Sequence, residues 1–192
     1  VRSRLVVVIV VLAWCLAAAP APSAHADTWG VLGGKLLLGT GTPAHGCELW
    51  ISNGTKKGTK LLKNIRPDAS GSYPLGFARL GKHVYFSAND GVHGFELWRT
   101  NGTKKGTKLV KDIDVGAAGS SPSSLVRFGR HIYFEALDAA KGGELWRTDG
   151  TAKGTKRVRD INPSGHSAPS QLAVLGKHLY FRATDGVNGL EV

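Results

Sequence analysis

Carboxylate side chains recur at fixed places along this chain of 192 residues and raise the question of a metal site. Asp90 and Asp185 each open an Asp-Gly turn, and Glu96 follows Asp90 by six residues. Calcium takes about six to eight oxygen ligands, which repeated Asp-Gly loops can supply. The spacing is not that of an EF-hand loop, however, and turn formation alone explains an Asp-Gly pair. We predict no cofactor, and retain Asp90, Glu96 and Asp185 as calcium candidates.

Three histidines also occupy equivalent places, at His83, His131 and His178, each directly after a Gly-Lys or Gly-Arg pair. A set of imidazoles is typical of a zinc site. These histidines lie in three separate copies of a repeat, however, where equivalent atoms are usually too far apart to share one ion. We predict that they lie on strand surfaces and bind no metal.

The chain shows no residue arrangement that is typical of nucleophilic or glycosidic catalysis. Its serine cluster at 120–124 lies in a Gly/Ser-rich linker and lacks a Gly-x-Ser-x-Gly elbow. A glycosidase needs two carboxylates about 5–10 Å apart, but the acidic residues here follow the repeat instead of marking one place. We therefore predict a protein that is not an enzyme. The alternatives are a fragment of a glycosidase-like or lyase-like propeller enzyme, whose catalytic blade lies beyond residue 192, and a truncated remnant.

The elements that position these side chains come from one repeated unit. The pattern Glu-Leu-Trp begins at Glu48, Glu96 and Glu144, so that successive copies start 48 residues apart. We divide the chain into a signal peptide at 1–26, a partial repeat at 27–47, three repeats at 48–95, 96–143 and 144–190, and the start of a truncated repeat at 191–192. Such periodicity is typical of solenoids, propellers and arrays.

Each unit contains four short segments with the composition of β-strands. In the second copy they are LVRFG, HIYFEA, ELWRT and TKLVKDI, rich in β-branched and aromatic residues. The Asn-Gly-Thr and Asp-Gly-Thr segments predict a tight hairpin turn before the fourth strand. A Gly/Ser/Pro-rich connection leads to the next unit.

Four antiparallel strands in each unit predict an all-β fold of tandem four-stranded repeats, similar to an incomplete β-propeller of about three and a half blades. The alternative is a β-solenoid or an open β-array. Closed propellers have typically about 4–8 blades, so self-association or further blades would be needed to close the ring. Aromatic residues that recur with the repeat are predicted to pack between the blades: Trp50, Trp98, Trp146, Tyr85, Tyr133 and Tyr180.

The repeated pattern resembles that of the ELWxxDGT repeat proteins. Residues 144–151 match the name of that family in full, while Asn53 and Asn101 replace the Asp in the earlier copies. The Asp-Gly-x-x-Gly segment that precedes Glu-Leu-Trp appears at 90–94 and is lost in part at 138–143 and 41–47. The resemblance implies a bacterial, usually exported protein with a propeller-like architecture, and it implies no reaction.

The first 26 residues differ from the remainder of the chain. Arg2 and Arg4 precede an apolar run, and the small-residue triplet Ala24-His25-Ala26 ends the segment. This order is typical of a secretory signal peptide, and it predicts cleavage after Ala26. We expect a protein that is secreted or lies at the cell surface or in the periplasm; a retained membrane anchor and lipidation at Cys15 are the alternatives.

The chain is basic, with a formal net charge of +11. Lysines recur after the Asn-Gly-Thr or Asp-Gly-Thr segment, and a further cation recurs in the fourth strand as Lys63, Lys111 and Arg159. The lysines that we predict as a belt for anionic partners are Lys56, Lys57, Lys104, Lys105 and Lys153. Alternatively, lysines on an outer edge strand serve to block pairing with other strands.

These features predict an exported, non-enzymatic β-repeat protein that acts as a binding or scaffolding module at the cell surface or outside the cell. An anionic polysaccharide or the envelope surface is the expected partner. Nucleic acid is not expected, because no nucleic-acid-binding motif is present.

Overall fold

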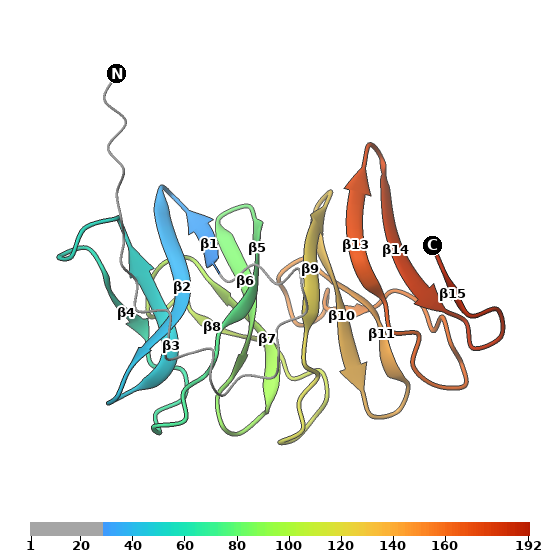
Figure 1. Ribbon diagram of the computed structural model, residues 1–192, viewed down its shortest axis with the longest axis horizontal. Helices are drawn as coiled ribbons and strands as arrows, with labels where there is room; N and C mark the ends of the chain where they lie inside the picture. Colours follow the sequence, from blue (N-terminus) through green and yellow to red (C-terminus); the bar gives the residue numbers. More distant parts are fainter. Residues whose placement is uncertain (1–28) are drawn as a thin grey trace.

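The computed structural model describes residues 29–192, which form β-strands and no helix (Figure 1). The predicted signal peptide and its cleavage point after Ala26 lie outside the described residues. Within residues 29–192, no helix is long and apolar enough to cross a membrane.

Four antiparallel sheets follow one another along the chain, three with four strands and the last with three. The first sheet contains β1 (Trp29–Leu32), β2 (Lys35–Thr42), β3 (Gly46–Ser52) and β4 (Lys60–Lys63). The second contains β5 (Leu75–Leu80), β6 (His83–Asn89), β7 (Phe95–Thr100) and β8 (Lys108–Lys111). The third contains β9 (Ser123–Phe128), β10 (His131–Asp138), β11 (Gly142–Thr148) and β12 (Lys156–Arg157). The fourth contains β13 (Ser170–Leu175), β14 (His178–Thr184) and β15 (Leu190–Glu191).

The prediction of an all-β fold with tandem four-stranded, propeller-like repeats is confirmed. Each sheet is built from one continuous stretch of chain with its strands in sequential order. A solenoid instead pairs strands of successive repeats in one sheet, so the sheet order of the described residues excludes that alternative. The four sheets stand side by side in chain order (Figure 1).

The first strands of neighbouring sheets contact one another: β1 with β5, β5 with β9, and β9 with β13. They therefore form the inner side of the array, and β4, β8 and β12 form its outer edge. Because consecutive strands are antiparallel, the turns from first to second strand and the loops from third to fourth strand lie at one end. The turns from second to third strand and the linkers between sheets lie at the opposite end.

The core lies between the sheets and not within any one of them. In β6, Val84, Phe86 and Ala88 point to the first sheet and Tyr85 points to the third, as expected because side chains alternate along a strand. Trp98 packs among the residues of the first interface, and Trp146 packs among those of the second. The second sheet thus buries its two faces against its two neighbours, as units of repeat architectures do.

The prediction of a tight hairpin turn between the third and fourth strands is wrong. Residues 101–107 form a loop of seven residues between β7 and β8. The Asn101 Oδ1 accepts hydrogen bonds from the Thr103 amide and hydroxyl, and Thr103 Oγ1 accepts one from the Gly106 amide. The Thr107 hydroxyl lies 2.7 Å from that of Thr100. Side-chain hydrogen bonds therefore fold a longer loop where sequence reasoning expects a backbone turn.

Candidate functional site

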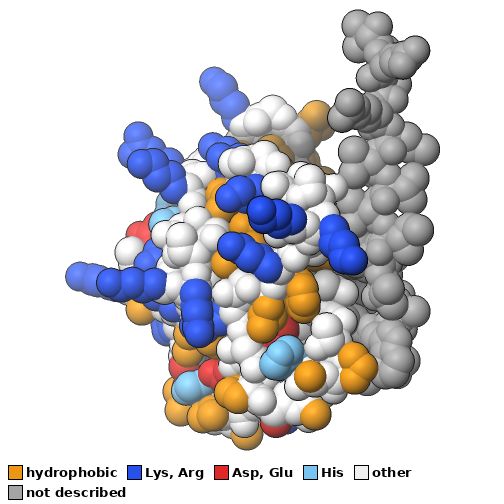
Figure 2. All heavy atoms as spheres, turned by 90° about the vertical axis from the view of Figure 1, so that its left-hand side faces the viewer, with side chains coloured by type: hydrophobic (Ala, Val, Ile, Leu, Met, Phe, Trp, Pro, Cys, Tyr) orange, Lys and Arg blue, Asp and Glu red, His pale blue; other side chains and the backbone are white. Residues whose placement is uncertain are grey.

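One end of the array carries most of the exposed lysines and arginines, and we call it the basic end. It consists of the turns between first and second strands, the strand residues next to those turns, and the loops between third and fourth strands. Its exposed cations are Lys35, Lys56, Lys57, Arg79, Lys82, Lys104, Lys105, Arg127, Arg130, Lys153 and Lys177. Within the described part of the chain, Asp149 is the one carboxylate in these turns and loops. Figure 2 shows the lysines and arginines mostly in the upper part of the molecule, with carboxylates lower down.

The cations of the basic end form an outer and an inner group. The five predicted belt lysines make up the outer group, since all of them lie exposed in the loops before the fourth strands. The inner group lies in the turns that follow the first strands and contains Lys82, Arg130 and Lys177. The inner group was not predicted from the sequence, because the Gly-Lys-His and Gly-Arg-His segments were considered only for their histidines. The recurring cation in those segments was the available signal.

Two cations of the fourth strands do not belong to this surface. Lys63 Nζ donates a hydrogen bond of 2.6 Å to the Thr107 carbonyl and lies 5.5 Å from the centre of the Trp98 ring. Lys111 Nζ likewise reaches the Thr155 carbonyl at 3.1 Å and lies 5.6 Å from the Trp146 ring. Burial, and then the charge of Lys104, lower the pKa of Lys63. These lysines connect neighbouring sheets.

The calcium candidate Glu96 is fully buried and bonded to the protein itself. Its carboxylate accepts hydrogen bonds from the Asp114 amide at 3.0 Å, from the Ser120 amide at 2.9 Å and from the Ser120 hydroxyl at 2.7 Å. Burial raises the pKa of Glu96 and outweighs these hydrogen bonds, which act in the opposite direction. These hydrogen bonds connect β7, the third strand of the second sheet, to the linker between β8 and β9.

Asp90 and Asp185 cap their own loops. Asp90 accepts hydrogen bonds from the amides of Val92 and His93 and lies 2.7 Å from the His93 ring nitrogen. Partial burial raises the pKa of Asp90, but the hydrogen bonds from His93 and Val92 outweigh this effect and leave it below its usual range. Hydrogen bonds from Asn188 and Val187 also lower the pKa of Asp185. Within residues 29–192, no group of three or more His, Cys, Asp or Glu residues is placed to hold a metal ion.

The three recurring histidines begin the second strands β6, β10 and β14 of the second, third and fourth sheets. Each ring lies near the tyrosine two residues further along its own strand, with centroids 6.5, 6.2 and 6.1 Å apart. Burial, followed by the charges of Arg99 and Lys108, lowers the pKa of His83. The histidines border the basic end and are not brought together with one another.

Of the predicted inter-blade aromatic residues, Trp98, Trp146 and Tyr85 are buried between sheets. Trp50 and Tyr133 are half-buried, and Tyr180 is 44% exposed. The difference follows position in the array, because the buried side chains face a neighbouring sheet that can cover them.

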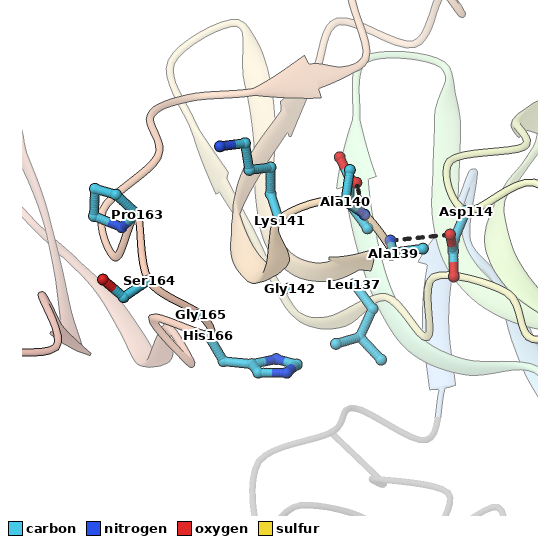
Figure 3. A pocket seen from close by; sticks show the side chains of 11 residues that line it. Asp114, Leu137, Ala139, Ala140, Lys141, Gly142, Pro163, Ser164, Gly165 and His166 are labelled. Atoms are coloured by element: carbon cyan, nitrogen blue, oxygen red, sulfur yellow. Dashed lines mark hydrogen bonds between the residues drawn. The ribbon is translucent and has the colours of Figure 1, made fainter.

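A cavity of about 450 Å³ opens at the end opposite to the basic end, between the β10–β11 turn and two linkers (Figure 3). Asp114 accepts a hydrogen bond from the Ala139 amide, and His166 Nδ1 accepts one from the Gly143 amide. Lys141 pairs with Asp160 at 3.1 Å. Asp114, His166 and Lys141 therefore already have partners within the protein.

Sequence reasoning missed this cavity, although a signal was present. The segment at 138–143 departs from the Asp-Gly-x-x-Gly pattern of the other copies, and the third unit is one residue shorter than the others. His166 consequently stands just before the buried Ser167, where Gly71 and Gly119 precede the corresponding serines.

No protein family and no curated protein matches this chain. A solved structure from a "Structural and Mechanistic Analysis of Two Prolyl Endopeptidases" is similar, with a TM-score of 0.50 and 20% sequence identity. The similarity covers 79% of this chain and 21% of that one, so this chain spans about a fifth of the length of the structure that it matches. At this identity the likeness shows the fold alone, and it agrees with the propeller-like arrangement of the sheets.

Proposed function

We propose that this protein is an exported, non-enzymatic binding module whose basic end attaches to an anionic polysaccharide of the cell envelope. The observation that carries the proposal is the separation of charge. Exposed lysines and arginines from all four sheets gather at one end, where Asp149 is the one carboxylate among the described residues. Many weak contacts at such a surface suit a long anionic polymer better than a small ligand.

The position of the lysines favours partner binding over the alternative of edge protection. Lysines that block strand pairing must lie on the edge strand itself. Lys60, Lys108 and Lys156 do so, at the start of β4, β8 and β12. Lys104 and Lys105 instead lie exposed in the loop before β8, so edge protection does not account for them.

The proposal includes membership of the ELWxxDGT repeat proteins and export through a signal peptide that is cleaved after Ala26. The match of residues 144–151 to the repeat pattern supports the first of these. The basic start, apolar run and small-residue triplet of residues 1–26 support the second.

The test measures binding of the protein to polygalacturonate and to neutral dextran at several salt concentrations. We expect the protein to bind polygalacturonate and not dextran. The affinity should fall steeply between about 50 and 300 mM salt, because salt screens contacts between exposed charges. The double substitution Lys104→Glu and Lys105→Glu should weaken binding about tenfold or more.

A matched control places the same change of charge at the opposite end, through Arg66→Glu and Lys141→Glu. This control should weaken binding far less than the substitutions at the basic end. Equal losses in the two double variants, or equal binding to dextran, would contradict the proposal. Anionic phospholipid vesicles tested in parallel distinguish a membrane surface from a polysaccharide.

A further inference from the structure

A polar residue that recurs every 48 residues lies close to the buried glutamates of the Glu-Leu-Trp pattern. It precedes an isoleucine in the segment after the fourth strand, and its three copies are Asn64, Asp112 and Asp160. The isoleucine amide donates a hydrogen bond of 2.7 Å to Glu48 in the first sheet and one of 3.0 Å to Glu144 in the third. The recurring residue is thus an amide in one sheet and a carboxylic acid in the other two.

In the first sheet, this amide supplies a hydrogen-bond donor to the glutamate. The partners of Asn64 orient its side chain so that Nδ2 donates to Glu48 Oε1 at 3.2 Å and to the Arg66 carbonyl at 2.9 Å. An aspartate at this place supplies no donor while it is ionised, because both of its oxygens can only accept. A protonated aspartate or glutamate has one O–H group that can donate.

The second and third sheets lack a donor at the corresponding place. Asp112 Oδ1, Asp160 Oδ1 and Glu144 Oε1 are buried, and none of them has a hydrogen-bond partner among the described residues. A buried charge without a partner is costly. Two carboxyl groups that share a site therefore favour a state in which one proton is bound to the pair.

The charged groups around the third-sheet pair do not supply the donor. Lys141 Nζ lies 3.1 Å from Asp160 Oδ2 and leaves Oδ1 without a partner. His166 Nδ1 accepts the hydrogen bond of the Gly143 amide. Arg157 Nη1 faces Asp138 at 4.0 Å. No hydrogen bond from these groups reaches Glu144 Oε1.

In the second sheet, His93 and Asp90 face the pair from the β6–β7 loop. The hydrogen bond with Asp90 raises the pKa of His93, and the charges of Asp90, Asp112 and Glu96 raise it further. Asp114 lies in the same linker as Asp112 but accepts a hydrogen bond from the third sheet, through the Ala139 amide. None of these groups donates to Asp112 Oδ1.

We propose that the pairs Glu96–Asp112 and Glu144–Asp160 each hold one shared proton, which fastens the linker to its sheet and whose loss loosens that linker. In the third sheet the proton lies between Glu144 Oε1 and Asp160 Oδ1, where the first sheet has the Asn64 amide. The linkers after the second and third sheets therefore respond to pH more strongly than the first linker. The fold thus contains a pH-sensitive device in two of its linkers.

The sign of the response follows from the burial of the pair. Burial raises the pKa of Glu96 above 4.5, so the stabilising contribution is fully present below about pH 4.5 and is lost as the pH rises through the raised value. An asparagine in place of Asp112 keeps its donor at every pH. The variant should therefore gain stability relative to wild type over the same pH range.

The experiment measures urea unfolding of the full chain from about pH 4 to pH 8. Near pH 4, Asp112→Asn and Asp160→Asn should have unfolding equilibrium constants close to that of wild type. Near pH 8 these constants should be about tenfold lower than in wild type, as expected for a pKa shift of about one unit. The reciprocal variant Asn64→Asp creates a third acidic pair, and its constant should rise about tenfold near pH 8.

Asp68→Asn is a matched control, because it makes the same change at an exposed site in the first linker. The hydrogen bond from Arg66 lowers the pKa of Asp68 below 3.8, so the difference between this variant and wild type should stay constant above about pH 5. Differences for Asp112→Asn and Asp160→Asn that likewise stay constant with pH would overturn the proposal. Stabilisation of wild type, but not of these two variants, by calcium or sodium at pH 8 would assign the place to a bound cation instead.

Hydrogen exchange provides a second measurement that needs no variant. As the pH rises, the amides of Asp114 and Ser120 should lose protection relative to those of Arg66 and Ser72, which hold the equivalent places in the first linker. Each comparison is corrected for the intrinsic effect of pH on exchange. Equal protection of the two linkers at all pH values would contradict a shared proton.

Discussion

Glu48, Glu96 and Glu144 have no exposed surface, although each carries a carboxyl group. All three begin the repeated Glu-Leu-Trp pattern, and each accepts a hydrogen bond from a serine hydroxyl in the linker that follows: Ser72, Ser120 or Ser167. Buried carboxylates are rare unless they have such partners. The glutamate therefore fixes where the chain leaves one sheet and enters the next.

Replacing Glu96 by glutamine tests the effect of this burial on the pH dependence of stability. Burial raises the pKa of Glu96 above 4.5. At a pH between 4.5 and this raised pKa, the folded state therefore keeps a proton that the unfolded state has released. The stabilising contribution is fully present below about pH 4.5 and is lost as the pH rises through the raised pKa. We expect the free energy of unfolding of Glu96→Gln to improve relative to wild type between pH 4 and pH 7.

Urea denaturation at several pH values measures this difference. Asp90 and Asp185, whose pKa values are lowered, contribute with the opposite sign, but they are present in both proteins and cancel. A difference between the two proteins that does not change with pH would show that Glu96 has its ordinary pKa.

The sequence predicted the role of the recurring aromatic residues but not that of the recurring glutamates. Tryptophans and tyrosines at a fixed period indicate packing between repeats, because large aromatic side chains seldom recur without a surface to cover. A glutamate at a fixed period gives no such indication. The burial of Glu96 depends on Ser120, which lies 24 residues further along the chain. The folded linker brings the two residues together.

At the scale of the elements, the seven-residue loop between the third and fourth strands has two roles. It carries the lysines of the basic end, and its glycine contacts the preceding sheet. Gly150 has a φ of +95°, and a methyl group there would collide with the Tyr85 hydroxyl. Gly129 has a φ of +59° in the β9–β10 turn, with open space around it.

These two glycines allow the contact to be separated from backbone strain. Gly129→Ala should destabilise the protein by about 1–2 kcal/mol, the cost of a side chain in the left-handed region. Gly150→Ala should cost at least about 2 kcal/mol more, because Tyr85 must also move out of a close-packed interface. Thermal unfolding of both variants measures the difference, and equal losses would mean that the Tyr85 contact contributes little.

Strand order and strand type could be predicted from the sequence, because alternation and β-branched residues indicate them locally. The loop at 101–107 could not, since Asn-Gly is also the signal of a two-residue turn. The side-chain oxygens of Asn101 and Thr103 accept hydrogen bonds from backbone amides of the loop, and these bonds decide between the two. Ser121 and Ser124 adopt φ values of 47° and 54° without being glycine, and their sequence contains no sign of it.

The whole molecule has a gradient of burial along the array. Val84 and Phe86 in β6 and Ile132 and Phe134 in β10 are fully buried, since each lies between two sheets. The equivalent residues of β14 are half-buried. The charge separation between the two ends was likewise not predictable from the sequence, because it depends on which connections share an end.

Native-state hydrogen exchange should follow this gradient. We expect the amides of β6 and β10 to exchange most slowly and those of β13–β15 about tenfold faster or more, because local opening of the last sheet exposes less buried surface. Mass spectrometry of peptic fragments resolves these segments. Uniform protection across the four sheets would show that the array unfolds as one cooperative unit.

The same contacts between sheets recur at successive interfaces, as Lys63 with Thr107 and Lys111 with Thr155 show. Recombination between two neighbouring copies within the gene would remove or add one unit of 47 or 48 codons and rejoin equivalent positions. Every interface in the shortened or lengthened product would then consist of contacts that already exist. Genes of this kind can change the number of their units in one genetic event, without first evolving a new surface.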